Sequence, residues 1–70
     1  MIFINDYTLE EVSVDERETL VPLIGSIVRI HGNEYQVNSI IYNYEPQIDD
    51  LGYTVDSLYC SEIYVHITPY

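Results

Sequence analysis

The stretch GSIVRIHGNEYQVNSIIYNYE, residues 25–45, decides the fold. Two runs rich in β-branched and aromatic residues flank a short polar turn, in which Gly32 and Asn33 both tolerate a positive φ. The pattern predicts an antiparallel hairpin formed by residues 26–31 and 34–42.

Each of the two predicted strands of this hairpin has one apolar face. In the first strand, Val28 and Ile30 share a face, and their neighbours in sequence share the other. In the second strand, the alternation of apolar and polar residues changes phase between Val37 and Ile40. A shift of one residue indicates a β-bulge near residues 38–39, and bulges bend strands at the corners of small barrels.

The end of the chain repeats the strand pattern. In residues 61–67 aliphatic residues occupy every second position, so that Ile63, Val65 and Ile67 share one face. We take the apolar faces of the three runs as the core. The predicted core residues are Val28, Ile30, Val37, Ile41, Ile63 and Val65.

The remaining segments give weaker signals. Residues 2–7 alternate and predict a short first strand. Residues 9–20 contain two Ser/Thr-x-x-Glu capping boxes, which favour a helix, although Val12 and Val14 alternate like a strand. We predict a short helix or an irregular acidic segment there. Residues 45–56 contain Pro46 and several turn formers, and therefore predict a long loop with room for one short strand.

These segments predict a single domain, residues 1–70, of the mainly-β class. We expect four to five short antiparallel strands in an SH3-like or OB-like half-open barrel, with the acidic helical or irregular insertion near residues 9–20. A small α+β fold is the alternative. The order of a glycine, a strand, a turn and a Tyr-x-Val sequence is similar to that in many SH3-like modules. This similarity supports the shape of the fold and no function.

Charge is the strongest feature of the composition. Twelve acidic residues face two arginines, there is no lysine, and the formal net charge is −10. Nothing neutralises phosphates, so direct binding to nucleic acid or to anionic membranes is disfavoured. Basic protein surfaces are favoured as partners. The alternative is that the acidity serves solubility alone.

The sequence start and the cysteine content indicate a compartment. The first residues, MIFIND, resemble neither a signal peptide nor a transit peptide, and no apolar run approaches the roughly 20 residues of a membrane span. One cysteine, Cys60, forms no internal disulfide. We expect a cytoplasmic protein, located in the host cytoplasm if it is encoded by a phage.

Catalytic, metal and cofactor motifs are weak. Cys60 and His66 lie on one predicted strand, about 20 Å apart at roughly 3.3 Å per residue. His31 lies at a hairpin turn. The aspartates near Gly52 lack the spacing of a calcium loop, and there is no phosphate-binding glycine motif. We therefore predict no enzymatic activity, no metal and no cofactor.

The acidic segment and the tyrosines suggest a surface for a partner. In a helix, Glu11, Asp15 and Glu18 would form one stripe with neighbours about 5–6 Å apart, on the order of the phosphate spacing in nucleic acids. The chain also has eight tyrosines, a residue enriched at interface hot spots. The predicted partner-binding residues are Glu10, Glu11, Asp15, Glu16, Glu18, Tyr42, Tyr44, Asp49, Asp50 and Tyr53.

From these residues we expect a non-catalytic acidic binding protein that docks on a basic surface of a partner protein. An inhibitor that mimics nucleic acid and acts on a nucleic-acid-binding protein, as in phages and mobile elements, is the specific form of this hypothesis. The alternative is a small homo-oligomeric structural or assembly protein whose acidity serves solubility.

Overall fold

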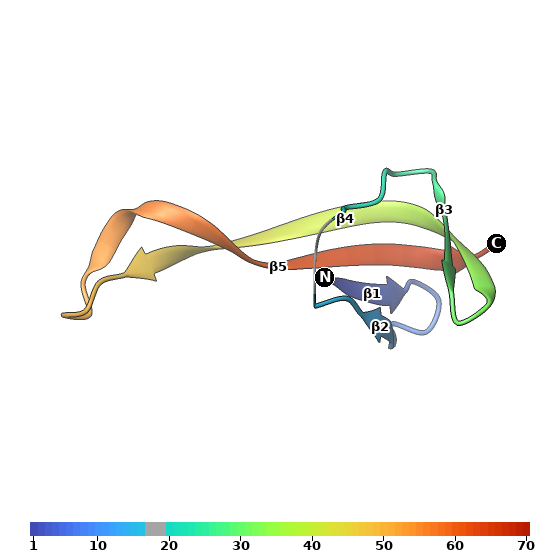
Figure 1. Cartoon of the computed structure of the whole chain (residues 1–70), viewed down its shortest axis with the longest axis horizontal. Coiled ribbons are helices and arrows are strands. Elements are labelled where there is room, and N and C mark those ends of the chain that lie inside the picture. Colours follow the sequence, from blue (N-terminus) through green and yellow to red (C-terminus); the bar gives the residue numbers. More distant parts are fainter. Residues whose placement is uncertain (17–19) are drawn as a thin grey trace.

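A computed structural model of the chain describes residues 1–16 and 20–70, with the side chains of residues 54–56 also left undescribed. Its strands form one nearly closed, barrel-shaped sheet in the order β2-β1-β5-β4-β3 (Figure 1). The mainly-β prediction is therefore confirmed. The strands are β1 (Ile2–Asn5), β2 (Glu11–Val14), β3 (Ile27–Ile30), β4 (Asn33–Ile48) and β5 (Thr54–Pro69).

The predicted central hairpin is present as β3 and β4. The pair Ile30–Asn33 closes a two-residue turn in which His31 has φ 50° and Gly32 has φ 82°. Two successive positive φ angles define the type I′ turn, whose twist matches that of the flanking strands. The positive φ angles thus fall on His31 and Gly32, one residue earlier than the sequence suggested.

The predicted bulge is also confirmed. The register between β4 and β5 shifts between Val37 and Ser39, which leaves Asn38 as the extra residue. This residue turns Ile40 toward the core. It also turns Ile41 outward, where it is 50% exposed, so the prediction that Ile41 is a core residue is wrong.

The core lies inside the barrel. Phe3, Val12 and Val28 pack against it from three different strands, and their side chains are partly buried. Val28 and Ile30 are therefore at the edge of the core rather than in its centre. The buried residues of the described core are Met1, Val37, Ile63, Val65 and Ile67.

The first strand corrects two predictions. β1 runs parallel to β5, with Ile2 opposite Tyr64, so the sheet is not wholly antiparallel. β2 pairs with β1 and places Val14 opposite Ile2, so residues 11–14 form a strand. The helical form of the segment predicted near residues 9–20 is therefore wrong among the described residues, and residues 17–19 of that segment lie outside them. The pairing with β1 outweighs the local capping signals.

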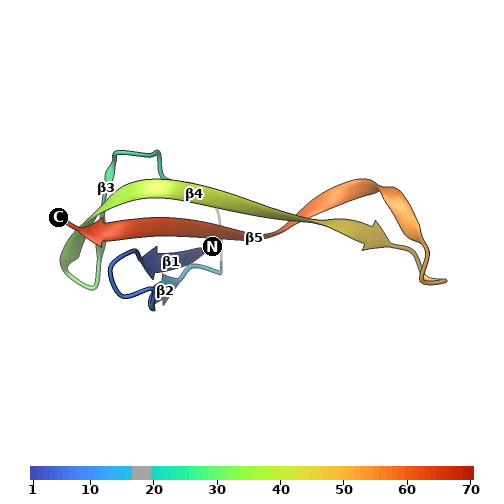
Figure 2. The same ribbon diagram turned by 180° about the vertical axis from the view of Figure 1, so that it is seen from behind.

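The two longest strands extend beyond the barrel. β4 and β5 each have 16 residues, whereas β3 and β1 cover only part of them. Residues 42–63 therefore form a two-stranded ribbon with a tight end, which we call the arm (Figures 1 and 2). It gives the molecule extents of 47 × 22 × 18 Å. The prediction of short strands is wrong here.

The arm also replaces most of the loop predicted at residues 45–56. Pro46 lies within β4, opposite Leu58. Proline is confined to edge strands because it has no N–H to donate, and in a two-stranded ribbon both strands are edges. The loop shrinks to a turn at the tip, where Asp49 accepts hydrogen bonds from the backbone N–H groups of Leu51 and Tyr53 at 3.0 and 2.8 Å.

Candidate functional site

One face of the arm is apolar. In an antiparallel ladder, residues opposite each other project from the same side of the sheet. Tyr42 lies opposite the buried Ile63, so this side continues the face that forms the core inside the barrel. Following the register outward, the apolar face consists of Tyr42, Tyr44, Pro46, Ile48, Leu58 and Cys60.

The other face of the arm is polar, and its side chains bond to one another across the strands. Asn43 Nδ2 donates to Ser61 Oγ at 2.8 Å. The Tyr59 hydroxyl donates to Glu45 Oε2 at 3.3 Å. Nearer the tip, Ser57 Oγ donates to Gln47 Oε1 at 3.1 Å. The polar face consists of Asn43, Glu45, Gln47, Ser57, Tyr59, Ser61 and Glu62.

The apolar face is open to solvent along its length. Tyr44 is 57% exposed and Leu58 is 65% exposed. Figures 1 and 2 show that the described part of the barrel does not fold back over the arm. Small soluble proteins seldom leave a contiguous apolar face uncovered, and such a face marks an interaction site. The arm is therefore the candidate functional site.

The charges of the arm all have one sign. Residues 42–63 contain five acidic residues and no lysine, arginine or histidine. Three of the acids, Glu45, Asp49 and Asp50, are exposed, and the last two lie at the turn that ends the arm. The field around the apolar face is therefore negative, which attracts a cationic partner and repels a second arm.

The structure divides the predicted partner-binding residues into two groups. One group lies on the arm, where the tyrosines belong to the apolar face or to the tip. The other group lies along and beyond β2 on the barrel, so the two groups do not form one continuous surface (Figure 1). The first group is Tyr42, Tyr44, Asp49, Asp50 and Tyr53, and the second is Glu10, Glu11, Asp15 and Glu16. Glu18 lies outside the described residues, and the helical stripe to which it was assigned has no helix at Glu11.

Four residues of the apolar face, namely Pro46, Ile48, Leu58 and Cys60, were not predicted from the sequence. For the first two, the signal was the strict alternation of YNYEPQI, residues 42–48. Pro46 and the aspartates that follow concealed it, because both are turn formers by local rules.

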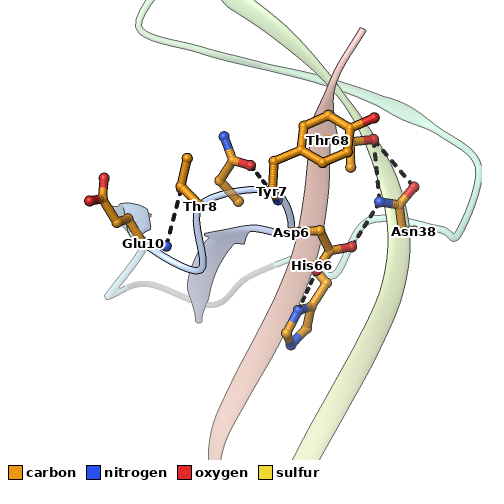
Figure 3. A network of polar contacts seen from close by, with 8 residues as sticks. Asp6, Tyr7, Thr8, Glu10, Asn38, His66 and Thr68 are labelled. Atoms are coloured by element: carbon orange, nitrogen blue, oxygen red, sulfur yellow. Dashed lines mark hydrogen bonds and ion pairs between the residues drawn. The ribbon is translucent and has the colours of Figure 1, made fainter.

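A second polar cluster lies on the outer surface of the barrel (Figure 3). His66 Nδ1 is 2.7 Å from Asp6 Oδ1, and Asn38 Nδ2 donates to Asp6 Oδ2 at 2.9 Å. The hydrogen bond from Asn38, followed by that from His66, lowers the pKa of the Asp6 carboxyl below its ordinary 3.8. Because Asn38 is the bulge residue, the bulge is what brings its amide to Asp6.

This cluster links three strands of the sheet. It joins the end of β1 to β5 and β4, and Asn38 also donates to Thr68 Oγ1 at 3.3 Å. Among the described residues, the hydroxyl of Thr68 is bonded to Asn38, whereas His66 is bonded to Asp6. Cys60 lies on the arm, well away from His66 on the same strand.

Within residues 1–16 and 20–70, no three side chains of the metal-ligating types come together. The described chain contains no helix long and apolar enough to cross a membrane. An open hollow of about 430 Å³ is lined by Glu34, Tyr35 and Tyr70, among others. The Glu34 carboxylate is paired with Arg29 at 3.3 Å.

No model of a known protein family matches this chain, and neither the curated proteins nor the solved structures contain a match. A functional proposal for this chain therefore depends on the geometry and charge of the arm and of the barrel.

Proposed function

We propose that this chain is a non-catalytic binding protein that docks on a basic surface of a partner protein through its arm. The observation that carries the proposal is the exposed apolar face on a segment whose charged residues are all acidic. Apolar area supplies the driving force for association, and the carboxylates select a cationic surface.

The roles of the residues follow from their positions. Tyr42 and Tyr44 present large, stiff side chains on the apolar face, where they act as anchors. Glu45 and Asp50 act at longer range, and they accelerate encounter with a basic surface. Asp49 has a structural role as well, because its carboxylate holds the tip turn.

We extend the proposal to an inhibitor that occupies the nucleic-acid-binding groove of its target. The support is the formal net charge of −10, which is spread over both the arm and the barrel. The helical stripe of carboxylates that would copy the phosphate spacing does not support mimicry, because residues 11–14 form a strand. Mimicry in this form rests on charge density alone.

The test is capture of a partner from a host lysate with the tagged protein, followed by binding measurements on the purified pair. Two double variants, in each of which two acidic side chains are replaced by their neutral amides, are compared with the wild type. One is Glu45→Gln with Asp50→Asn on the arm, and the other is Glu10→Gln with Glu11→Gln on the barrel. The arm variant is expected to bind more weakly, and the wild-type affinity to fall as salt shortens the screening length from about 8 Å at physiological ionic strength to about 3 Å at 1 M.

Two results would count against the proposal. If both neutral variants bind like the wild type at every salt concentration, the acidity serves solubility. If DNA or RNA and this protein bind the captured partner together without interference, the inhibitor form of the proposal is wrong, whereas docking on a basic surface still stands.

A homo-oligomeric structural protein is the second candidate. The exposed apolar face favours it, since two faces could cover each other. The charge opposes it, because each arm brings five acidic residues and no basic one. Light scattering over a range of concentrations separates the two candidates, and a stable dimer at micromolar concentration would favour the second.

A further inference from the structure

We propose that the apolar face of the arm is a docking site for a basic amphipathic α-helix of a partner protein. This inference rests on the proposed function and names the element that the arm would bind. It is carried by three properties of the arm: its width, its length and the sign of its charges.

The dimensions of the apolar face fit one helix. Two paired strands lie about 4.8 Å apart, so the face with its side chains is about 10 Å wide, close to the diameter of a helix. Residues 42–48 span roughly 20 Å at about 3.3 Å per residue. A helix covers the same length with about 13 residues, or between three and four turns.

A helix packed on this face would cover it in the same way as the chain covers the apolar face inside the barrel. A sheet face that is apolar is stable when another layer covers it. Inside the barrel the face around Ile63 and Val65 is covered by the chain itself. Beyond Tyr42 the same face continues with no covering layer among the described residues. An isolated two-stranded ribbon is only marginally stable in water, so a covering helix would also stabilise the arm.

The charges select the kind of helix. The arm carries Asp50 in its tip turn and Glu45 on its polar face, and it has no basic residue between positions 42 and 63. A helix on the apolar face that carries lysine or arginine beside its apolar stripe lies in the negative field of these carboxylates. A second copy of this chain would instead add five more acidic residues. The occupant is therefore a basic helix of another protein.

The test uses a designed peptide as the probe. It is a 14-residue peptide of leucine and lysine with the leucines at helical spacing and one tryptophan, which gives a clean fluorescence signal because this chain has no tryptophan. Two peptides serve as controls: one has the same composition in scrambled order, and the other has glutamate in place of lysine. Binding of each is measured by fluorescence anisotropy at physiological salt.

The arm itself provides a matched pair of variants. Tyr44 lies on the apolar face and Tyr59 on the polar face, and both are substantially exposed at 57% and 44%. Tyr44→Ser is expected to weaken binding of the patterned peptide about tenfold or more, as truncation of an anchor does. Tyr59→Ser is expected to change it by about twofold or less. Leu58→Ser serves as a second variant of the apolar face, and circular dichroism checks that each variant is folded.

Three results would overturn the inference: equal effects of Tyr44→Ser and Tyr59→Ser, equal binding of the patterned and scrambled peptides, or no binding of the patterned peptide. A dimer that Tyr44→Ser converts to a monomer would assign the face to a second copy. Binding to phosphatidylcholine vesicles that Tyr44→Ser abolishes would assign it to a lipid surface.

The outcome for the proposed function can be read separately. If the captured partner still depends on Glu45 and Asp50 but not on Tyr44, docking on a basic surface stands and the helix site is wrong. If Tyr44 controls peptide binding but the neutral variants capture the partner like the wild type, the helix site stands and the charge-based function is wrong.

Discussion

Among the described residues, two that are not glycine hold a left-handed backbone conformation. Leu9 has φ 60° in the turn between β1 and β2, and His31 has φ 50° in the turn between β3 and β4. For a residue with a β-carbon this conformation costs roughly 1–2 kcal/mol, and asparagine adopts it with less strain. Leu9 is 76% exposed, so its side chain offers little burial in return.

We therefore predict that Leu9→Asn and His31→Asn each raise the free energy of unfolding by about 0.5–1 kcal/mol. The second change creates Asn-Gly, the preferred sequence of a type I′ turn. Chemical denaturation measures both. Leu23→Asn is the matched control, because Leu23 is exposed and is not among the described residues with a positive φ. An equal gain in the control would show that surface polarity, and not backbone strain, is responsible.

The Asp6 carboxylate predicts a dependence of stability on acid. Its pKa is lowered in the folded state, so its contribution is fully present above the ordinary value of 3.8 and is lost as the pH falls below that value toward the folded pKa. Asp6→Asn should lower the free energy of unfolding at pH 7 by on the order of 1 kcal/mol, a figure that allows for solvent screening. The gap from the wild type should close below pH 3.8. A gap that is constant from pH 7 to pH 2 would show that the charge of Asp6 contributes nothing.

The elements that the sequence predicts well are those whose signals are local. The β3–β4 hairpin follows from alternation and a glycine turn, and the bulge at Asn38 follows from a change of phase over a few residues. Residues 11–14 could not be assigned in the same way. Their capping signals are local, whereas the pairing of Val14 with Ile2 that outweighs them is set by the tertiary fold.

In the arm, too, local signals predicted the wrong structure, here a loop in place of a long strand. Pro46, Asp49 and Gly52 are turn formers by local rules, and only the last two lie at a turn. Nothing in the local sequence says that β4 will continue without a third strand beside it, which is what makes Pro46 acceptable. The site was therefore predicted in part: Tyr42 and Tyr44 were identified, and the partner strand that completes their face was not.

An arm that stands apart from the core should also be separable from it. We predict that replacing residues 45–59 with Asn-Gly, which joins the paired residues Tyr44 and Cys60 by a two-residue turn, leaves the barrel folded. The free energy of unfolding should change by about 1 kcal/mol or less, because all five buried residues of the described core lie outside the deleted segment. Amide NMR spectra should retain the signals of Val37, Val65 and Ile67. Collapse of those signals would show that the arm is part of the folding unit.

At the scale of the whole molecule, the chain is extended for its length. Its radius of gyration is 14.8 Å, whereas a compact chain of this size has about 11 Å. Composition alone gave the sign of the surface charge but not its distribution. Of the twelve acidic residues, five lie on the arm and six on the barrel and its connections, whereas Glu18 lies outside the described residues.

The position of Pro46 has a consequence for the behaviour of the protein at high concentration. A bare ribbon has two unpaired strand edges, and such edges can recruit further strands into growing fibrils. Pro46 brings no amide hydrogen to the β4 edge, and the register shifts around it break the regular repeat that a fibril needs. The arm can therefore offer its side chains to a partner while its backbone resists polymerisation.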